Sequence, residues 1–246
     1  MKGRLGKYSL WQFRDFFMQH GIGIAVIGLL WGYTLLAPLR AAISVQSAVT
    51  PMGPGSPIWS LVLQITSAVV SVSVLIAMNG IVSADRKSGY YRFLFSKPVN
   101  RVLYYTQLFF VYMVGVMLIM AVLSSLLRII LPTFNVAYFL LYAALVYIAM
   151  GGIGFLLSVS TRYDWLTLAA VWLGSRILRG IYAGPHAGWK GKAVQLLPPV
   201  HRLDDVANSL IGTGSAHLPD VVWLLAYGAV CFVIGLMILR YGSLAD

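Results

Sequence analysis

Long apolar runs separated by short polar segments make up most of the chain. A membrane-spanning helix needs about 20 mostly apolar residues, and six runs meet that length. They cover residues 21–39, 58–82, 102–130, 136–158, 165–182 and 221–239. The run over 165–182 is the least apolar because it contains Arg176 and Arg179. The pattern predicts an all-α integral membrane protein with six transmembrane helices, forming a single transmembrane domain over residues 1–246.

The composition supports a lipid environment. Hydrophobic residues make up 59% of the chain and charged residues only 10%, and every one of the seven acidic residues is an aspartate. A water-soluble domain is usually about one quarter charged, so these counts exclude an ordinary soluble protein. The net charge of +11 is spread between the apolar runs, where it serves membrane topology, and no nucleic-acid partner is expected.

The distribution of Lys and Arg predicts the orientation. The N-terminal segment, the 83–101 loop and the ends of spans four and six carry eleven basic residues, against seven on the opposite side. Short cytoplasmic loops are enriched in Lys and Arg. Both termini are therefore predicted to be cytoplasmic.

Two segments outside the spans are amphipathic. Residues 1–20 alternate aromatic and polar side chains, which suits either an interfacial helix in the headgroup layer or an extension of the first span. The outer segment, 184–219, precedes the sixth span. Its 203–211 portion is predicted to form a short helix that starts after Pro198–Pro199 and ends at Gly212.

Polar residues inside the spans are the candidates for a solute path. In span two, Ser60, Gln64, Ser67 and Ser71 share one helical face. They line either the path or a seam where small hydroxyl residues let helices pack closely. In span five, the same spacing relates three larger side chains, which either face a cavity or extend toward the outer interface. These are Trp172, Arg176 and Arg179.

Small residues spaced four apart predict close helix contacts. The pairs are Gly28 with Gly32 in span one and Gly154 with Ser158 in span four. Such pairs let two backbones approach in a membrane, so we expect a neighbouring helix at each of them.

Several chemistries have no motif in the chain. Gly191–Lys192 is not part of a phosphate-binding loop, because the first Gly that loop requires is replaced by His186. The outer histidines are 15 and 16 residues apart, which is not metal-ligand spacing. All aspartates fall in loops, termini or span edges, so we expect no carboxylate at membrane depth to bind a driving ion. The sequence thus predicts no catalytic residue, no metal site and no nucleotide-binding domain.

The loop over 83–101 is the most concentrated charged patch, and aromatic residues are mixed into it. That composition suits either a docking surface with aromatic anchors or a basic loop whose aromatics rest in the interface. The candidate docking residues are Asp85, Arg86, Gly89, Tyr90, Tyr91, Arg92, Phe93, Leu94, Ser96, Pro98 and Arg101.

This loop resembles that of type-2 ABC transporter permeases, which have the type V exporter fold. Those permeases carry an acid-Arg-x-x-Gly motif after span two, followed by a Leu and a Ser-x-Pro-Val-x-Arg run before span three. The matching residues are Asp85, Arg86, Gly89, Leu94, Ser96, Pro98, Val99 and Arg101. The chain departs from the pattern at Asp85, where Glu is usual, and at Tyr90, where Thr is usual.

The resemblance implies a function and partners. It implies that the loop is a coupling helix docked on a separate ABC ATPase subunit, present in two copies, which binds ATP and Mg²⁺. It further implies a homodimer in the bacterial inner membrane that exports a solute. The alternatives are a stand-alone six-span channel or transporter and, more remotely, a scaffold of a larger membrane complex.

Overall fold

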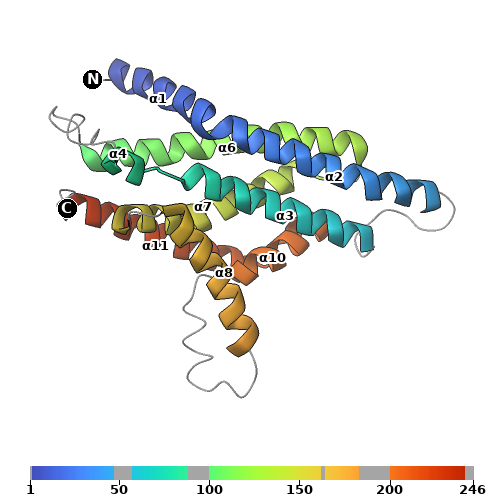
Figure 1. The fold of residues 1–246 in the computed structure, drawn as a ribbon. Helices are drawn as coiled ribbons and strands as arrows, with labels where there is room; N and C mark the ends of the chain where they lie inside the picture. The colour runs from blue at the N-terminus through green and yellow to red at the C-terminus, as the bar shows by residue number, and fades with distance from the viewer. Residues whose placement is uncertain (1, 47–56, 88–99, 162–163, 183–199, 242–246) are drawn as a thin grey trace.

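The computed structural model describes residues 2–46, 57–87, 100–161, 164–182 and 200–241. Every regular element in these ranges is helical, which confirms the all-α prediction. The helices form an elongated bundle (Figure 1). Within the described ranges, five helices are long and apolar enough to cross a membrane. The chain therefore has the architecture of a multi-pass membrane protein.

The N-terminal segment continues directly into the first span. Helix α1 (Lys2–Phe16) is joined to α2 (Ile22–Gln46) by the π-helical turn η1 (Phe17–Gly21). The two helices run nearly in line along one side of the bundle (Figure 1). Of the two interpretations of residues 1–20, an extension of span one describes this backbone.

Capping residues explain where the two central helices begin. Helix α6 (Arg101–Ile130) starts after Asn100, and α7 (Val136–Ser160) starts after Asn135. Each Asn side chain accepts hydrogen bonds from the backbone N–H groups two and three residues further along the chain. These bonds satisfy donors that a helix start leaves unpaired. Both helices match the predicted spans to within two residues.

The remaining long helices also match predicted spans. Helix α3 (Pro57–Met78) is span two, and α11 (Leu218–Tyr241) is span six. Helix α8 (Asp164–Tyr182) occupies the place of span five, but its described apolar part covers only Leu166–Ser175. Its later part points away from the bundle (Figure 1). Five described helices thus have the length and apolarity of membrane spans, and the sixth crossing stays a prediction.

Helix α7 forms the centre of the bundle and packs against α3, α6, α8 and α11. Its Tyr147 is fully buried, and the Tyr147 hydroxyl donates to the Phe109 carbonyl oxygen at 2.9 Å. Phe109, Phe155 and Phe232 stack around this point. The core thus joins three helices through aromatic side chains.

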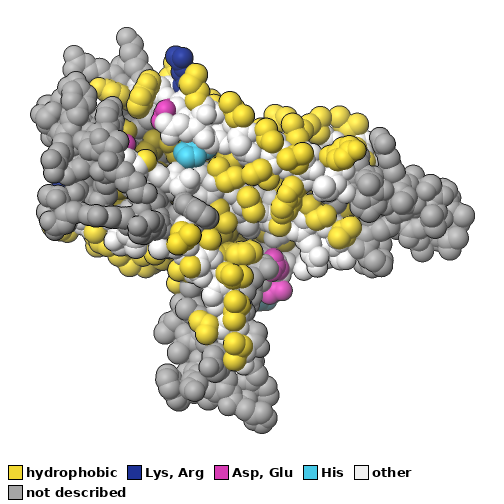
Figure 2. All heavy atoms as spheres, viewed as in Figure 1, with side chains coloured by type: hydrophobic (Ala, Val, Ile, Leu, Met, Phe, Trp, Pro, Cys, Tyr) yellow, Lys and Arg dark blue, Asp and Glu magenta, His cyan; other side chains and the backbone are white. Residues whose placement is uncertain are grey.

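The surface around this core is apolar. In the face seen in Figure 2, hydrophobic side chains are spread over the whole described surface and charged ones are few. Helix α11 shows this best, with exposed Val222, Val230, Val233, Ile234 and Met237. A water-exposed surface rarely carries apolar patches of this extent, and a lipid-exposed surface does.

Candidate functional site

A turn at Gly80 joins the end of span two to the start of the predicted docking loop. After α3 ends at Met78, Gly80 adopts a left-handed backbone with φ of 82°, and α4 (Ser83–Lys87) follows. The backbone N–H of Val82 donates to Ser158 Oγ at 3.1 Å. The start of the loop is therefore attached to α7 as well as to α3.

Asp85, the acidic residue of the motif, is attached to a third helix. The hydroxyl of Tyr105 donates to Asp85 Oδ2 at 3.2 Å, and the Tyr105 side chain is fully buried in α6. Arg86 lies on α4 and Arg101 is exposed at the start of α6. Asp85, near the start of the predicted docking loop, is thus hydrogen-bonded to α6, the helix that follows the loop.

The other predicted docking residues lie outside the described residues. The side chain of Arg86 lies outside the described part of the structure. So do Gly89, Tyr90, Tyr91, Arg92, Phe93, Leu94, Ser96 and Pro98. Their docking role stays a prediction.

Helix α1 packs on the same end of α6. Gln107 Nε2 donates to Ser9 Oγ at 2.7 Å, and the Phe16 ring lies against Gly115. The start of α1, the start of α6, α4 and the end of α11 all lie at one end of the bundle (Figure 1). Helix α1 is therefore joined to α6 at the end of the bundle where α4 lies.

The sequence analysis missed Gln12 at this end. Its side chain is 1% exposed, and neither of its amide atoms has a hydrogen-bond partner in the described part of the structure. A buried amide without partners costs free energy, so it marks a place where packing is not optimised for stability. The spacing of Ser9, Gln12, Phe16 and His20 along one face was the available signal.

The polar stripe of span two divides into two parts. Ser60 and Gln64 are exposed, whereas Ser67 and Ser71 are buried at 7% and 6% exposure. Ser67 Oγ lies 2.8 Å from the Tyr142 hydroxyl and donates to Asp204 Oδ1 at 3.3 Å. At Ser67 the stripe is a hydrogen-bonded contact between helices, while Gln64 faces outward.

The position of Asp204 was not expected from the sequence. Ser67 lies eight residues into the candidate span that begins at Trp59, so it is about 12 Å along a helix that rises 1.5 Å per residue. Asp204 itself belongs to α10 (Val200–Ala207), outside the candidate spans, and its contact with Ser67 brings a carboxylate against α3 at that height. The reason is that α10 packs against α3 and α7 instead of lying outside the bundle.

The short helix predicted before span six is present. Helix α10 runs into the π-helical turn η2 (Asn208–Thr213), and Gly214 ends it with φ of 72°. The end comes two residues after the predicted Gly212. Leu203, Val206, Leu210 and Ile211 are buried, so the apolar face of this amphipathic segment packs into the bundle.

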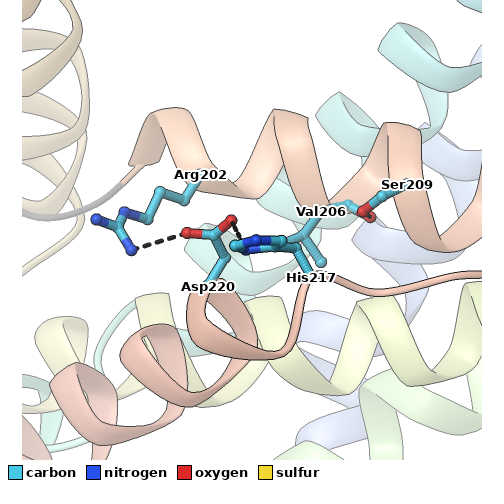
Figure 3. A network of polar contacts seen from close by, with 5 residues as sticks. All are labelled: Arg202, Val206, Ser209, His217 and Asp220. Atoms are coloured by element: carbon cyan, nitrogen blue, oxygen red, sulfur yellow. Dashed lines mark hydrogen bonds and ion pairs between the residues drawn. The ribbon is translucent and has the colours of Figure 1, made fainter.

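An ion pair holds this segment to α11. Arg202 Nη1 donates to Asp220 Oδ1 at 2.8 Å, and His217 Nδ1 lies 3.0 Å from Asp220 Oδ2 (Figure 3). Asp220 also sits in the first turn of α11, where a negative charge is favourable. The three residues connect the end of the outer segment to the sixth span.

Of the predicted span-five residues, Trp172 is partly buried against the core of the bundle. The side chains of Arg176 and Arg179 lie outside the described part of the structure, and both positions belong to α8.

Within the described ranges, no three His, Cys, Asp or Glu side chains gather to hold a metal ion. Comparisons of the chain with protein-family models, curated proteins and solved structures gave no match.

Proposed function

We propose that this chain is the membrane-spanning permease subunit of an ATP-driven ABC transporter of the type V exporter fold. In this proposal, two copies form the export path in a bacterial inner membrane, with both termini cytoplasmic. Each copy docks through residues 83–101 on a separate ATPase subunit that binds ATP and Mg²⁺. The chain itself carries no hydrolytic chemistry and acts mechanically.

The attachment of α4 is the observation that carries the proposal. A docking loop converts a push into helix motion only if its ends are bonded to rigid elements. Asp85 is bonded to Tyr105 of α6, and Val82 is bonded to Ser158 of α7. These bonds would pass a displacement of the loop to three spans at once, since α4 also follows α3 directly. Packed helices transmit such a displacement as rigid bodies.

The path itself would lie where two copies face each other. Gln64 is exposed on α3, so it is the predicted path residue that a solute meets first. Ser67 and Ser71 are buried within one copy and would line the path only after α3 moves. Arg176 and Arg179, if they face the path, favour anionic or amphipathic solutes.

A stand-alone transporter is the second candidate, and Asp204 favours it. A carboxylate at membrane depth is a functional-site candidate by default, and ion-coupled transporters place such groups near the substrate site. Under this candidate, the Ser67–Tyr142–Asp204 contact would bind the driving ion, and residues 83–101 would be a basic turn.

Reconstitution with and without a partner separates the candidates. The tagged chain is purified from its native membrane, and copurifying polypeptides are tested for ATP hydrolysis. We expect an ATPase whose activity falls several-fold when Asp85 and Arg86 are both changed to Ala. The matched control is Asp205→Ala, on the exposed face of α10. Solute accumulation in liposomes by the chain alone, without ATP, would instead establish the stand-alone transporter.

A further inference from the structure

A cavity of about 350 Å³ lies between α2, α3 and α6. Its walls include Trp31, Ile65, Val69, Leu123 and Phe134. Leu29, Tyr33 and Leu126 belong to its rim and are exposed by 55%, 75% and 45%. The volume falls in the range of ligand-binding pockets, about 300–1,000 Å³. The cavity therefore has the size of a binding site and opens through apolar side chains.

The lining offers mainly apolar contacts, with the Trp31 indole and the exposed Tyr33 hydroxyl as its polar groups beside two aliphatic hydroxyls. The two aliphatic hydroxyls both donate to carbonyl oxygens of their own helices: Thr66 Oγ1 to Val62 at 2.5 Å, and Ser124 Oγ to Ala121 at 3.1 Å. A strongly polar ligand would lose its hydration here and regain few hydrogen bonds, which is costly. The site thus selects for a hydrocarbon group.

The length of the cavity matches one leaflet of a bilayer. Its lining runs along α6 from Met120 to Ile130, which is about 15 Å at 1.5 Å per residue. The hydrocarbon core of a bilayer is about 30 Å thick, so the cavity extends from near the membrane edge to near its middle. Arg128 lies exposed in the last turn of α6, at the edge end of this path. A guanidinium there suits a lipid phosphate.

We propose that this cavity binds one acyl chain of an anionic phospholipid, whose phosphate lies near Arg128. The site does not depend on the proposed transport function, because it needs only the membrane placement of α2, α3 and α6. A second copy of the chain and a free hydrophobic solute are the other possible occupants, and the experiment distinguishes them.

The glycines of α2 provide a matched pair of variants. A β-carbon on Gly32 meets nothing within 4 Å, and Gly32 lines the cavity, so the side chain of Gly32→Leu would start in open space and occupy part of the cavity. Gly23 also has open space within 4 Å, but it does not line the cavity. Gly23→Leu is therefore the control for inserting the same side chain in the same helix.

The test is native mass spectrometry of the protein after exchange into nanodiscs of phosphatidylglycerol. We expect one retained phosphatidylglycerol per chain in the wild type and in Gly23→Leu. Retention should fall at least five-fold in Gly32→Leu, and by a smaller factor in Arg128→Gln. Equal retention in Gly32→Leu and the wild type would overturn the proposal. The proposal would also be overturned if Gly32→Leu lost a dimer of the chain and kept its lipid. Release of the bound lipid by a hydrophobic solute alone would overturn it too.

A second measurement covers the case in which Gly32→Leu does not fold. Wild-type protein is irradiated in liposomes that contain phosphatidylglycerol with a mid-chain diazirine, and the labelled peptides are mapped. Adducts concentrated on residues 28–33 and 120–130 support the site. Adducts spread evenly over the exposed face of α11 would show only bulk lipid and would contradict it.

Discussion

The backbones of Gly152 and Gly228 touch where α7 crosses α11. A β-carbon added to Gly152 would overlap the carbonyl oxygen of Gly228, and one added to Gly228 would overlap the carbonyl oxygen of Ile148. Lipid gives no hydrophobic drive for two helices to associate, so close backbone packing must supply the attraction. This pair of glycines allows α11 to lie directly on the central helix of the bundle.

Gly228→Ala is therefore expected to destabilise the protein. The added methyl group meets backbone atoms, which cannot rotate away, so the two helices must separate. Overpacking of a tight interior typically costs about 1–3 kcal/mol, and we expect the upper part of that range. The measurement is the thermal unfolding midpoint in detergent micelles.

Gly23→Ala is the control for this prediction. Gly23 has no atom within 4 Å of a β-carbon, and Ala is favoured over Gly in a helix by about 1 kcal/mol. The control should match or exceed the wild-type unfolding temperature. An equal shift in both variants would mean that contact between α7 and α11 is not the cause.

A double-mutant cycle on Ser67 and Tyr142 is expected to show a favourable coupling. Their hydroxyl oxygens are 2.8 Å apart, and both side chains are buried. Interhelical hydrogen bonds in membrane proteins contribute about 0.6 kcal/mol on average and about 1.7 kcal/mol at most. Ser67→Ala, Tyr142→Phe and the double variant should give a coupling in that range when unfolding is measured in micelles.

Ser73 supplies the comparison for the cycle. It is also buried in α3, but its hydroxyl donates to the Val69 carbonyl of its own helix at 2.7 Å. Ser73→Ala combined with Tyr142→Phe should therefore be additive. A similar coupling for both serines would show that the effect is general to α3.

The sequence predicted α6 and α7 well because their ends are determined locally. Asn100 and Asn135 cap the helix starts, and Pro132 follows the end of α6. A capping side chain or a proline acts on backbone groups a few residues away. Such boundaries need no knowledge of the rest of the fold.

Contacts between helices were harder to predict, because they depend on which face each helix turns inward. Of the small-residue pairs, Gly28 meets Leu123, Gly154 meets Leu168 and Met78, and Ser158 accepts from Val82. A β-carbon on Gly32, which borders the cavity, meets nothing within 4 Å in the described part of this chain, so its predicted helix contact is not made there. Small residues permit a close approach, but only the neighbouring helix decides whether it occurs.

The placement of Asp204 shows the same limit for polar residues. Its sequence neighbours indicate an outer amphipathic helix, and that helix exists. Helix α10 packs against α3 and α7, and this packing brings the Asp204 carboxylate to Ser67. No local sequence pattern encodes such tertiary packing. The part of the candidate site that depends on α10 was therefore not predictable from the sequence.

Asp220→Asn is expected to have a small effect on stability, in contrast to the glycine variant. The Arg202–Asp220 pair is short at 2.8 Å, but its side chains are 34% and 25% exposed. Partly exposed ion pairs contribute about 0–1 kcal/mol, and Asn keeps a hydrogen-bond acceptor for Arg202. The free energy of unfolding should fall by less than about 1 kcal/mol. A larger loss would mean that the attachment of α10 to α11 supports the whole bundle.

Gly80→Ala is expected to reduce both stability and coupling to the proposed ATPase. Gly80 has a φ of 82°, a β-carbon there would lie 3.2 Å from Ala84, and the turn it forms sets the direction of α4. A left-handed conformation costs a residue with a β-carbon about 1–2 kcal/mol. If residues 83–101 dock on an ATPase, the variant should also lower solute-stimulated ATP hydrolysis in the purified assembly.

Gly214→Ala separates these two effects. Gly214 has a similar φ of 72°, but it ends the α10–η2 segment, which packs on α3, α7 and α11 far along the chain from α4. Both variants should lose about the same stability, and only Gly80→Ala should lose coupling at a temperature where both remain folded. Equal loss of coupling would trace the effect to general destabilisation, whereas an unaffected Gly80→Ala assembly would remove α4 from the path of energy transfer.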